Sequence, residues 1–138
     1  GTYSITTALE SSNVLETADG SGSAGANIRL GTSGRKNSKL FTVYHDGNGY
    51  YCLMNEGSGL IADVQGAGIS DCTNIQQWNC NGSAAQQWTI NQNSDGTVTF
   101  ISACNGKAMD VAGGNPDSGT NVWCYTPNGT NAQKWYLN

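Results

Sequence analysis

Two acidic residues are each followed, fifteen positions later, by an aromatic residue: Asp63 by Trp78, and Asp110 by Tyr125. An ionised carboxylate only accepts hydrogen bonds, and its two oxygens can take them from two neighbouring hydroxyls. An aromatic ring adds a flat apolar face that can stack against C–H groups. A neutral hexose has vicinal hydroxyls and a flat C–H face, so the two pairs predict two shallow sugar-binding pockets.

Amide side chains accompany the first pair. Gln76, Asn81 and Gln86 follow Asp63, and their amides can donate hydrogen bonds to the remaining hydroxyls and accept them. Gly66, three positions after the acid, would let the backbone approach a ligand closely. We predict that all of them contact the ligand. Two alternatives stay open: the glutamine fits a bracing role toward the acid equally well, and the asparagine fits its Asn-Gly turn.

The second pair repeats this arrangement with one change in chemistry. The predicted site residues there are Asp110, Gly113, Tyr125, Asn128 and Gln133. Trp123 stands where the first set has Gln76. We therefore expect one polar contact to be lost and a differently shaped rim to replace it.

An upstream copy of the pattern lacks most of these groups. Glu16 lies 47 residues before Asp63 and is one methylene longer, so we expect it to crowd a sugar, and Gly31 at the aromatic position removes the stacking surface. Ser38 and Leu40 take the places of the glutamine and the tryptophan, provided that one residue is missing from this copy. We expect no ordinary hexose to bind here. Four basic residues of this region are interpreted as a solvated face, with an acidic-sugar site as the alternative: Arg29, Arg35, Lys36 and Lys39.

A period of 47 residues divides the chain into three units, at about 1–48, 49–96 and 97–138. Short apolar alternations bounded by Asn-Gly and Asp-Gly pairs predict strands joined by tight hairpins, and no stretch has the pattern of an amphipathic helix. Four strands are expected per unit, and in the last unit they fall at about 97–103, 107–111, 120–125 and 133–137. An apolar final strand favours a closed all-β structure over a linear solenoid, whose ends should be polar.

Composition narrows the class of protein. A chain of 138 residues with 4 Trp and 6 Tyr has enough apolar material for one packed domain. The net charge of −4 argues against a nucleic-acid partner, and no apolar run approaches the length of a membrane-spanning helix. The chain begins at Gly1 without a signal peptide, which fits a processed or excised segment.

The five cysteines match no metal motif, and the single His45 adds little to a metal site. Cys72 and Cys80 flank a predicted strand, Thr73–Asn79, which would hold them too far apart for a disulfide. The state of the other three cysteines stays open. We expect no metal and no cofactor.

Two Gln-x-Trp motifs complete the repeats. They are Gln86-Gln87-Trp88 and Gln133-Lys134-Trp135, preceded by Ala62-Asp63-Val64 and Met109-Asp110-Val111. With these motifs the chain resembles, over its whole length, the ricin B-chain-type lectins, also called carbohydrate-binding module family thirteen. The resemblance implies a single β-trefoil domain over residues 1–138, with a six-stranded barrel, three hairpins and up to three sugar pockets, α, β and γ, one per repeat.

The resemblance also implies glycan partners. Galactose-type sugars come first and xylan or arabinan polymers next, bound by a secreted or cell-surface module that is appended to a glycan-active enzyme. Many members bridge a Cys two positions before the pocket acid to one just after the aromatic residue. Ile61 and Ala108 occupy that first position, so Cys80 lacks the usual partner.

Catalysis is not expected. A glycosidase needs two facing carboxylates about 5–10 Å apart, whereas the repeat symmetry would place Asp63 and Asp110 on different faces. Apart from the single histidine, nothing in the sequence indicates a Ser/His/Asp catalytic triad. The remaining alternative is a protein-binding trefoil such as a protease inhibitor, which would not need an acid, an aromatic residue and a glutamine in the same register twice.

Overall fold

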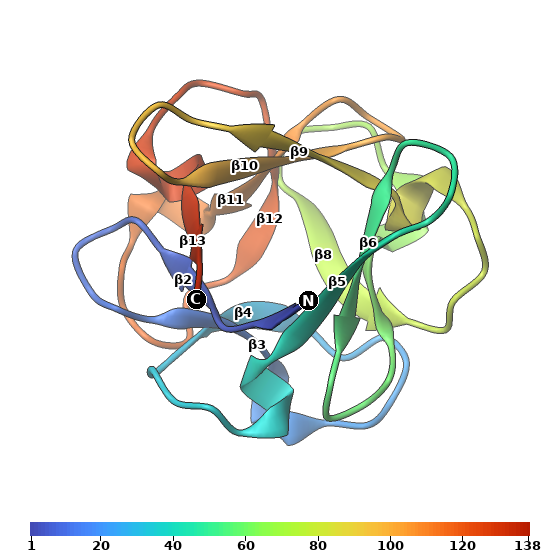
Figure 1. Cartoon of the computed structure of the whole chain (residues 1–138), viewed down its shortest axis with the longest axis horizontal. Coiled ribbons are helices and arrows are strands. Elements are labelled where there is room, and N and C mark those ends of the chain that lie inside the picture. The colour runs from blue at the N-terminus through green and yellow to red at the C-terminus, as the bar shows by residue number, and fades with distance from the viewer.

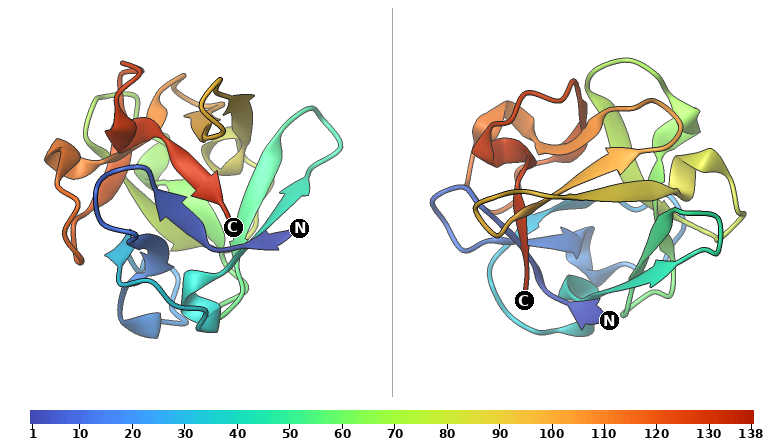
Figure 2. Two further views of the ribbon diagram at one scale, coloured as in Figure 1. Left: turned by 60° about the vertical axis from the view of Figure 1, so that its left-hand side comes forward. Right: turned by 45° about the horizontal axis from the view of Figure 1, so that its top comes forward.

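The computed structural model describes all residues, 1–138, as an all-β trefoil (Figures 1 and 2). Figure 1 looks down the pseudo-threefold axis and shows one lobe for each repeat. The thirteen strands are β1 (Thr2–Tyr3), β2 (Ile5–Thr7), β3 (Val14–Thr17), β4 (Ile28–Gly31), β5 (Phe41–His45), β6 (Tyr51–Asn55), β7 (Ile61–Val64), β8 (Thr73–Trp78), β9 (Trp88–Gln92), β10 (Val98–Ser102), β11 (Ala108–Val111), β12 (Val122–Tyr125) and β13 (Trp135–Leu137).

Strand pairing closes the barrel. Around the ring, β1 pairs with β5, then β5 with β6, β6 with β9, β9 with β10, β10 with β13, and β13 with β2, which continues from β1. Ser4, between β1 and β2, exchanges backbone hydrogen bonds with Asn138, so the two ends of the chain lie together. Closure leaves the barrel without a free strand edge, and the solenoid alternative does not apply.

Three antiparallel hairpins cap one end of the barrel: β3 with β4, β7 with β8, and β11 with β12. Each hairpin's first strand leads into a single turn of 3-10 helix, and a second such turn precedes the next barrel strand. These turns are η1 (Ala18–Gly20), η2 (Asn37–Lys39), η3 (Gln65–Ala67), η4 (Ala84–Gln86), η5 (Ala112–Gly114) and η6 (Asn131–Gln133). No helix is long and apolar enough to span a membrane.

The repeats meet on the axis through three asparagines. Asn27 donates from Nδ2 to Asn121 Oδ1 at 2.7 Å, Asn121 to Asn74 at 2.9 Å, and Asn74 to Asn27 at 2.8 Å. Every amide therefore donates to one neighbour and accepts from the other. The ring satisfies part-buried polar groups where the three hairpins converge.

The core corrects the expected alignment of the first repeat. Trp88, Trp135 and Phe41 are all fully buried, and each begins the barrel strand that follows a 3-10 turn. The turn η2 begins 47 residues before η4, so no residue is missing there, and the counterpart of Trp88 is Phe41 rather than Leu40. The one difference in length lies earlier, because the turn between Thr7 and Asn13 is one residue longer than its counterparts.

The predicted four strands per unit are found in the second and third units, whereas the first unit has five because β1 and β2 are separate strands. The predicted strands are also too long at their ends. The fourth strand of the last unit begins at Trp135, not at residue 133, because residues 131–133 form a 3-10 turn. The strand between Cys72 and Cys80 ends at Trp78. Glycines of the predicted Asn-Gly and Asp-Gly turns, such as Gly82 and Gly129, have the expected positive φ. All five cysteines are free thiols.

Candidate functional site

The acid of the second repeat sits on a hairpin strand, directly opposite an amide. Asp63 on β7 is in register with Gln76 on β8, and the Gln76 Nε2 donates to Asp63 Oδ1 at 3.2 Å. Asp63 is only 5 % exposed, yet it lies in the wall of a surface depression of about 400 Å³, which we call the β pocket. The carboxylate is therefore held deep in the pocket, where a ligand must reach it from the open side.

Gln86 holds the other carboxylate oxygen. Its Nε2 donates to Asp63 Oδ2 at 3.0 Å and to the carbonyl of Asn79 at 2.8 Å, while its Oε1 accepts from the backbone N–H of Asn81 at 2.9 Å. Gln86 is 1 % exposed, and both of its amide hydrogens are used within the protein. This geometry supports the bracing role for the glutamine over direct ligand contact.

The other predicted residues surround the acid. Trp78, at the end of β8, is 40 % exposed and lines the pocket together with Gly66 and Asn81. Gly66 has φ +61° within η3, so its contribution is a left-handed turn that leaves open space. The Asn81 side-chain oxygen accepts from the backbone of Ser83, which fits a turn role, and its amide nitrogen is left to face solvent.

The third repeat builds the same arrangement, which we call the γ pocket. Gln133 Nε2 donates to Asp110 Oδ2 at 2.9 Å and to a backbone carbonyl, and its Oε1 accepts from the N–H of Asn128. Tyr125 is 36 % exposed and Gly113 has φ +62°, as their counterparts lead one to expect. All the predicted γ residues except the buried Gln133 line the pocket.

Trp123 overturns one expectation. It faces Asp110 in the register that Gln76 has with Asp63, and its indole Nε1 donates to Asp110 Oδ1 at 2.8 Å. The polar contact to the acid is therefore kept, with an indole N–H in place of an amide N–H. What changes is the rest of the side chain, which presents an aromatic ring to the γ pocket.

The γ pocket is also larger than the β pocket and has a more apolar lining. Its volume is about 560 Å³, and Leu9 from the first repeat and Cys72 from the second contribute to its walls. Burial raises the pKa of the Asp110 carboxyl above its ordinary value of 3.8, and the hydrogen bonds from Gln133 and Trp123 oppose that shift only in part. Neighbouring Asp71 adds a smaller upward push on this pKa.

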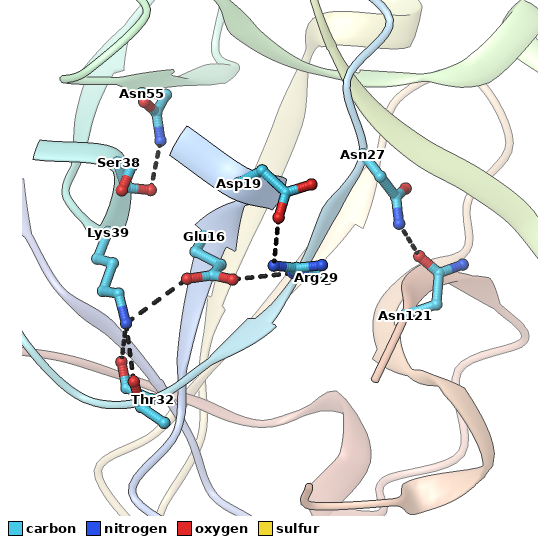
Figure 3. A network of polar contacts seen from close by, with 9 residues as sticks. All are labelled: Glu16, Asp19, Asn27, Arg29, Thr32, Ser38, Lys39, Asn55 and Asn121. Atoms are coloured by element: carbon cyan, nitrogen blue, oxygen red, sulfur yellow. Dashed lines mark hydrogen bonds and ion pairs between the residues drawn. The ribbon is translucent and has the colours of Figure 1, made fainter. Parts of the chain in front are cut away.

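In the first repeat the same positions hold an ion-pair cluster instead of a pocket (Figure 3). Glu16 is in register with Arg29, whose Nε lies 2.9 Å from Glu16 Oε2. Lys39 Nζ lies 3.6 Å from Glu16 Oε1 and also donates to Thr32. Because Lys39 lies 47 residues before Gln86, the two cations occupy the positions of the two neutral donors of the other repeats.

This cluster corrects two expectations. Arg29 and Lys39 are not part of a solvated face: both pair with Glu16, and the Lys39 side chain is only 12 % exposed. Only Arg35 and Lys36 of the four basic residues are exposed. Glu16 does not merely crowd the site, since its carboxylate fills the space that a side chain at Gly31 would need.

The sequence reasoning missed the roles of Lys39, Leu9 and Cys72. A strict 47-residue alignment would have revealed Lys39 as the partner of Glu16. No local signal points to Leu9 or Cys72, because they reach the γ pocket from neighbouring repeats. No group of three or more His, Cys, Asp or Glu side chains is placed to hold a metal ion.

Comparisons with known proteins agree with this architecture. A designed threefold-symmetric protein, ThreeFoil, superposes with a TM-score of 0.95 at 31 % identity, over 99 % of this chain and 96 % of that one. An exo-β-1,3-galactanase from Clostridium thermocellum matches at 27 % identity and a TM-score of 0.93, over 99 % of this chain but only 29 % of its own. A ricin B-like lectin from Macrolepiota procera, solved with lactose, matches in fold at 18 % identity with a TM-score of 0.85, over 100 % of this chain and 94 % of that one.

A search of curated protein sequences found no match. The model of the ricin-type β-trefoil lectin domain-like family matches residues 1–78, 37–125 and 84–138, which together cover the whole chain. The first two matches each span two capping hairpins, and the third spans the last one. The chain belongs to the ricin-type β-trefoil lectin domain-like family.

Proposed function

We propose that this chain is a non-catalytic carbohydrate-binding module that holds galactose-type sugars in its β and γ pockets and none in the first repeat. One observation carries the proposal. In both pockets a carboxylate is fixed through both oxygens, and an exposed aromatic ring stands at the same register position beside it. The lectin fold and family membership support carbohydrate binding in general.

The chemistry of binding follows from the hydrogen bonds that the carboxylate oxygens can still accept. Asp63 accepts one internal hydrogen bond on each oxygen, which leaves each oxygen able to accept another from a sugar hydroxyl. Trp78 would stack on the C–H face of the ring, and the amide of Asn81 would donate to a further hydroxyl. Asp110, Tyr125 and Asn128 would act in the same way in the γ pocket.

The expected affinity is low for each pocket. Stacking over about 100 Å² contributes roughly 2.5 kcal/mol, and charge-assisted hydrogen bonds contribute about 1.5–3 kcal/mol each. Lost translational freedom costs at least ~4 kcal/mol. The balance corresponds to a dissociation constant of about 0.1–1 mM. Two pockets engaging one repeating glycan would raise the avidity about 100-fold.

A place beside a catalytic domain fits this low affinity. The chain spans 29 % of the galactanase that it resembles, which supports the idea of a module appended to a secreted glycan-active enzyme. The module would keep such an enzyme close to its polymer, while the chemistry takes place in another domain. Multivalent contact with a glycan then matters more than tight binding by one pocket.

The test is a titration of the chain with galactose, lactose, N-acetylgalactosamine, xylo-oligosaccharides and arabino-oligosaccharides. Tryptophan fluorescence is a suitable signal because Trp78 and Trp123 line the two pockets, whereas Trp88 and Trp135 are buried. Calorimetry gives the number of sites. We expect galactosides to bind at two sites and pentose oligomers to bind more weakly.

Substitutions assign the sites. Asp63→Ala and Asp110→Ala should each remove one site, and the double variant should lose all binding, a drop of about 100-fold or more per site. Asp117→Ala, an exposed acid outside both pockets, is the control and should bind as the unchanged chain does. Retained binding in the double variant, or no response to any glycan, would contradict the proposal and favour a protein-binding trefoil.

A further inference from the structure

We propose that the γ pocket recognises two linked sugar rings, whereas the β pocket recognises a single terminal ring. This inference rests on the proposed function and adds a division of labour between the two pockets. It starts from three differences between them: their aromatic surface, their walls and their supply of polar groups. Each difference favours a longer ligand in the γ pocket.

The aromatic surface comes first. In the β pocket one ring, Trp78, is available, and its neighbour on the strand is the amide of Gln76. In the γ pocket Trp123 and Tyr125 are both rings, with centroids 6.4 Å apart and planes inclined by 21°. Both rings line the γ pocket, so its walls carry more aromatic surface than those of the β pocket, which a single ring lines.

The walls extend the γ pocket beyond its own repeat. The residues around the β pocket all come from the second repeat, between Asp63 and Ala85. The γ pocket adds Leu9 on one flank and Cys72 on the other, and its volume is about 560 Å³ against about 400 Å³. At the position equivalent to Cys72, 47 residues earlier, the β pocket has Gly25 near its rim.

The Cys72 wall is held in place by bonds between repeats. The Cys72 N–H donates to the carbonyl of Cys124 at 2.8 Å. Next to it, Asp71 accepts from the N–H and the hydroxyl of Thr126, both at 2.8 Å, and pairs with Lys107 at 3.0 Å. A fixed wall can contact a second sugar ring without a large ordering cost.

The supply of polar groups points the same way. The indole N–H of Trp123 is used by Asp110, so the γ pocket lacks the further donor and acceptor that the Gln76 amide offers in the β pocket. A single ring would therefore make fewer hydrogen bonds in the γ pocket. Apolar contact with a second sugar ring compensates for the missing hydrogen bonds. The γ pocket therefore distinguishes ligands by their length.

The experiment separates the pockets by substitution. Asp63→Ala leaves only the γ pocket, and Asp110→Ala leaves only the β pocket. For each variant, calorimetry compares methyl β-galactoside with lactose. We expect lactose to bind about threefold to tenfold more tightly than the monosaccharide in the γ pocket, the range of one extra aromatic contact, and about equally in the β pocket.

Two further variants test the cause. In the Asp63→Ala background, Trp123→Gln gives the γ pocket the side chain of the β pocket and should remove the preference for lactose. Cys72→Gly should reduce that preference in part, and it should fold normally because Cys72 has φ +68°, a conformation suited to glycine. Far-ultraviolet circular dichroism and the melting temperature check the fold of both.

The outcomes are distinct. Galactoside binding with the same lactose preference in both pockets would overturn the inference and leave the proposed function standing. A preference that survives Trp123→Gln together with Cys72→Gly would also overturn it. If no galactoside binds in either single-pocket variant, the proposed function fails, and the division of labour fails with it.

Discussion

The first repeat and the third repeat place the same skeleton around an acid, and they differ in what the acid is left to do. Glu16 and Asp110 both lie on the first strand of a capping hairpin, and each carboxylate has one partner across the hairpin and one from the following 3-10 turn. In the third repeat those partners are neutral. In the first they are cations, and glycine replaces the aromatic residue.

The difference teaches how a binding pocket becomes a structural cluster. A carboxylate held by neutral donors keeps its charge for a ligand, and burial without a counter-charge is reflected in the raised pKa of Asp110. Glu16 forms ion pairs with Arg29 and Lys39, so its carboxylate is already paired inside the protein and is not left for sugar hydroxyls. Because Gly31 provides no ring, nothing remains on which a sugar could stack.

Removing Glu16 is the substitution in the first repeat from which we expect the largest loss of stability. Glu16→Ala leaves the mostly buried Lys39 without its counter-charge and leaves Arg29 with only the exposed Asp19, and we expect it to lower the free energy of unfolding by about 2–3 kcal/mol. Galactoside binding should stay within about twofold, because the β and γ pockets are untouched. Urea denaturation and a galactose titration measure the two effects.

Glu10→Ala is the matched control, since Glu10 is exposed and forms no ion pair. It should change the free energy of unfolding by no more than about 0.5 kcal/mol. If Glu16→Ala abolished sugar binding with the fold intact, the first repeat would hold a working site and the contrast with the third repeat would be wrong.

A pH titration sharpens the comparison from the side of the γ pocket. In the Asp63→Ala variant only Asp110 supports binding, and sugar affinity should fall as this carboxyl becomes protonated. Because burial raises its pKa, the affinity should fall to half at a pH above 3.8 as the pH is lowered. Below that midpoint the affinity should decrease about tenfold for each pH unit. Calorimetry at a series of pH values checks this, and a midpoint at or below pH 3.8 would contradict it.

The same pKa shift affects stability, with a dependence on pH opposite to that of sugar affinity. A carboxyl whose pKa is higher in the folded than in the unfolded state binds more protons when folded. The contribution of Asp110 to the free energy of unfolding therefore decreases as the pH rises through the window that begins at 3.8 and ends at the raised value. Asp110→Asn should remove this dependence, which acid-range thermal melts would show.

The repeat period, together with the strand and turn patterns, predicts a closed all-β structure of three units, and the family resemblance adds the trefoil. The 47-residue repeat fixed the positions of Asp63, Trp78 and Gln86 and their third-repeat counterparts, and these residues do meet. The predicted alignment of the first repeat is wrong by one residue, because it sets Leu40 rather than Phe41 against Trp88. Other large apolar side chains can fill this core position, so Phe41 is buried there although the first repeat lacks the Gln-x-Trp motif.

Two other features depended on contacts that no local pattern reveals. Arg29 and Lys39 look like solvated charges in the sequence because ten residues separate them. The hairpin register brings Arg29 to Glu16, and the turn η2 brings Lys39. Trp123 was expected to end a polar contact because it lacks an amide. Its indole N–H replaces that donor, since a donor in the same place meets the same need of the acid.

The smallest expected effect concerns the missing aromatic residue of the first repeat. A Cβ at Gly31 would lie 2.0 Å from Glu16 Oε1, so Gly31→Ala must displace the carboxylate from its two cations. The carboxylate is the end of a flexible side chain, and we expect a loss of only about 1 kcal/mol in the free energy of unfolding. In the Glu16→Ala background the same substitution should cost nothing, because the clash and the ion pairs are already gone. Gly22→Ala, with open space around it, is the control, and a Gly31→Ala effect that persists without Glu16 would show that the glycine serves another purpose.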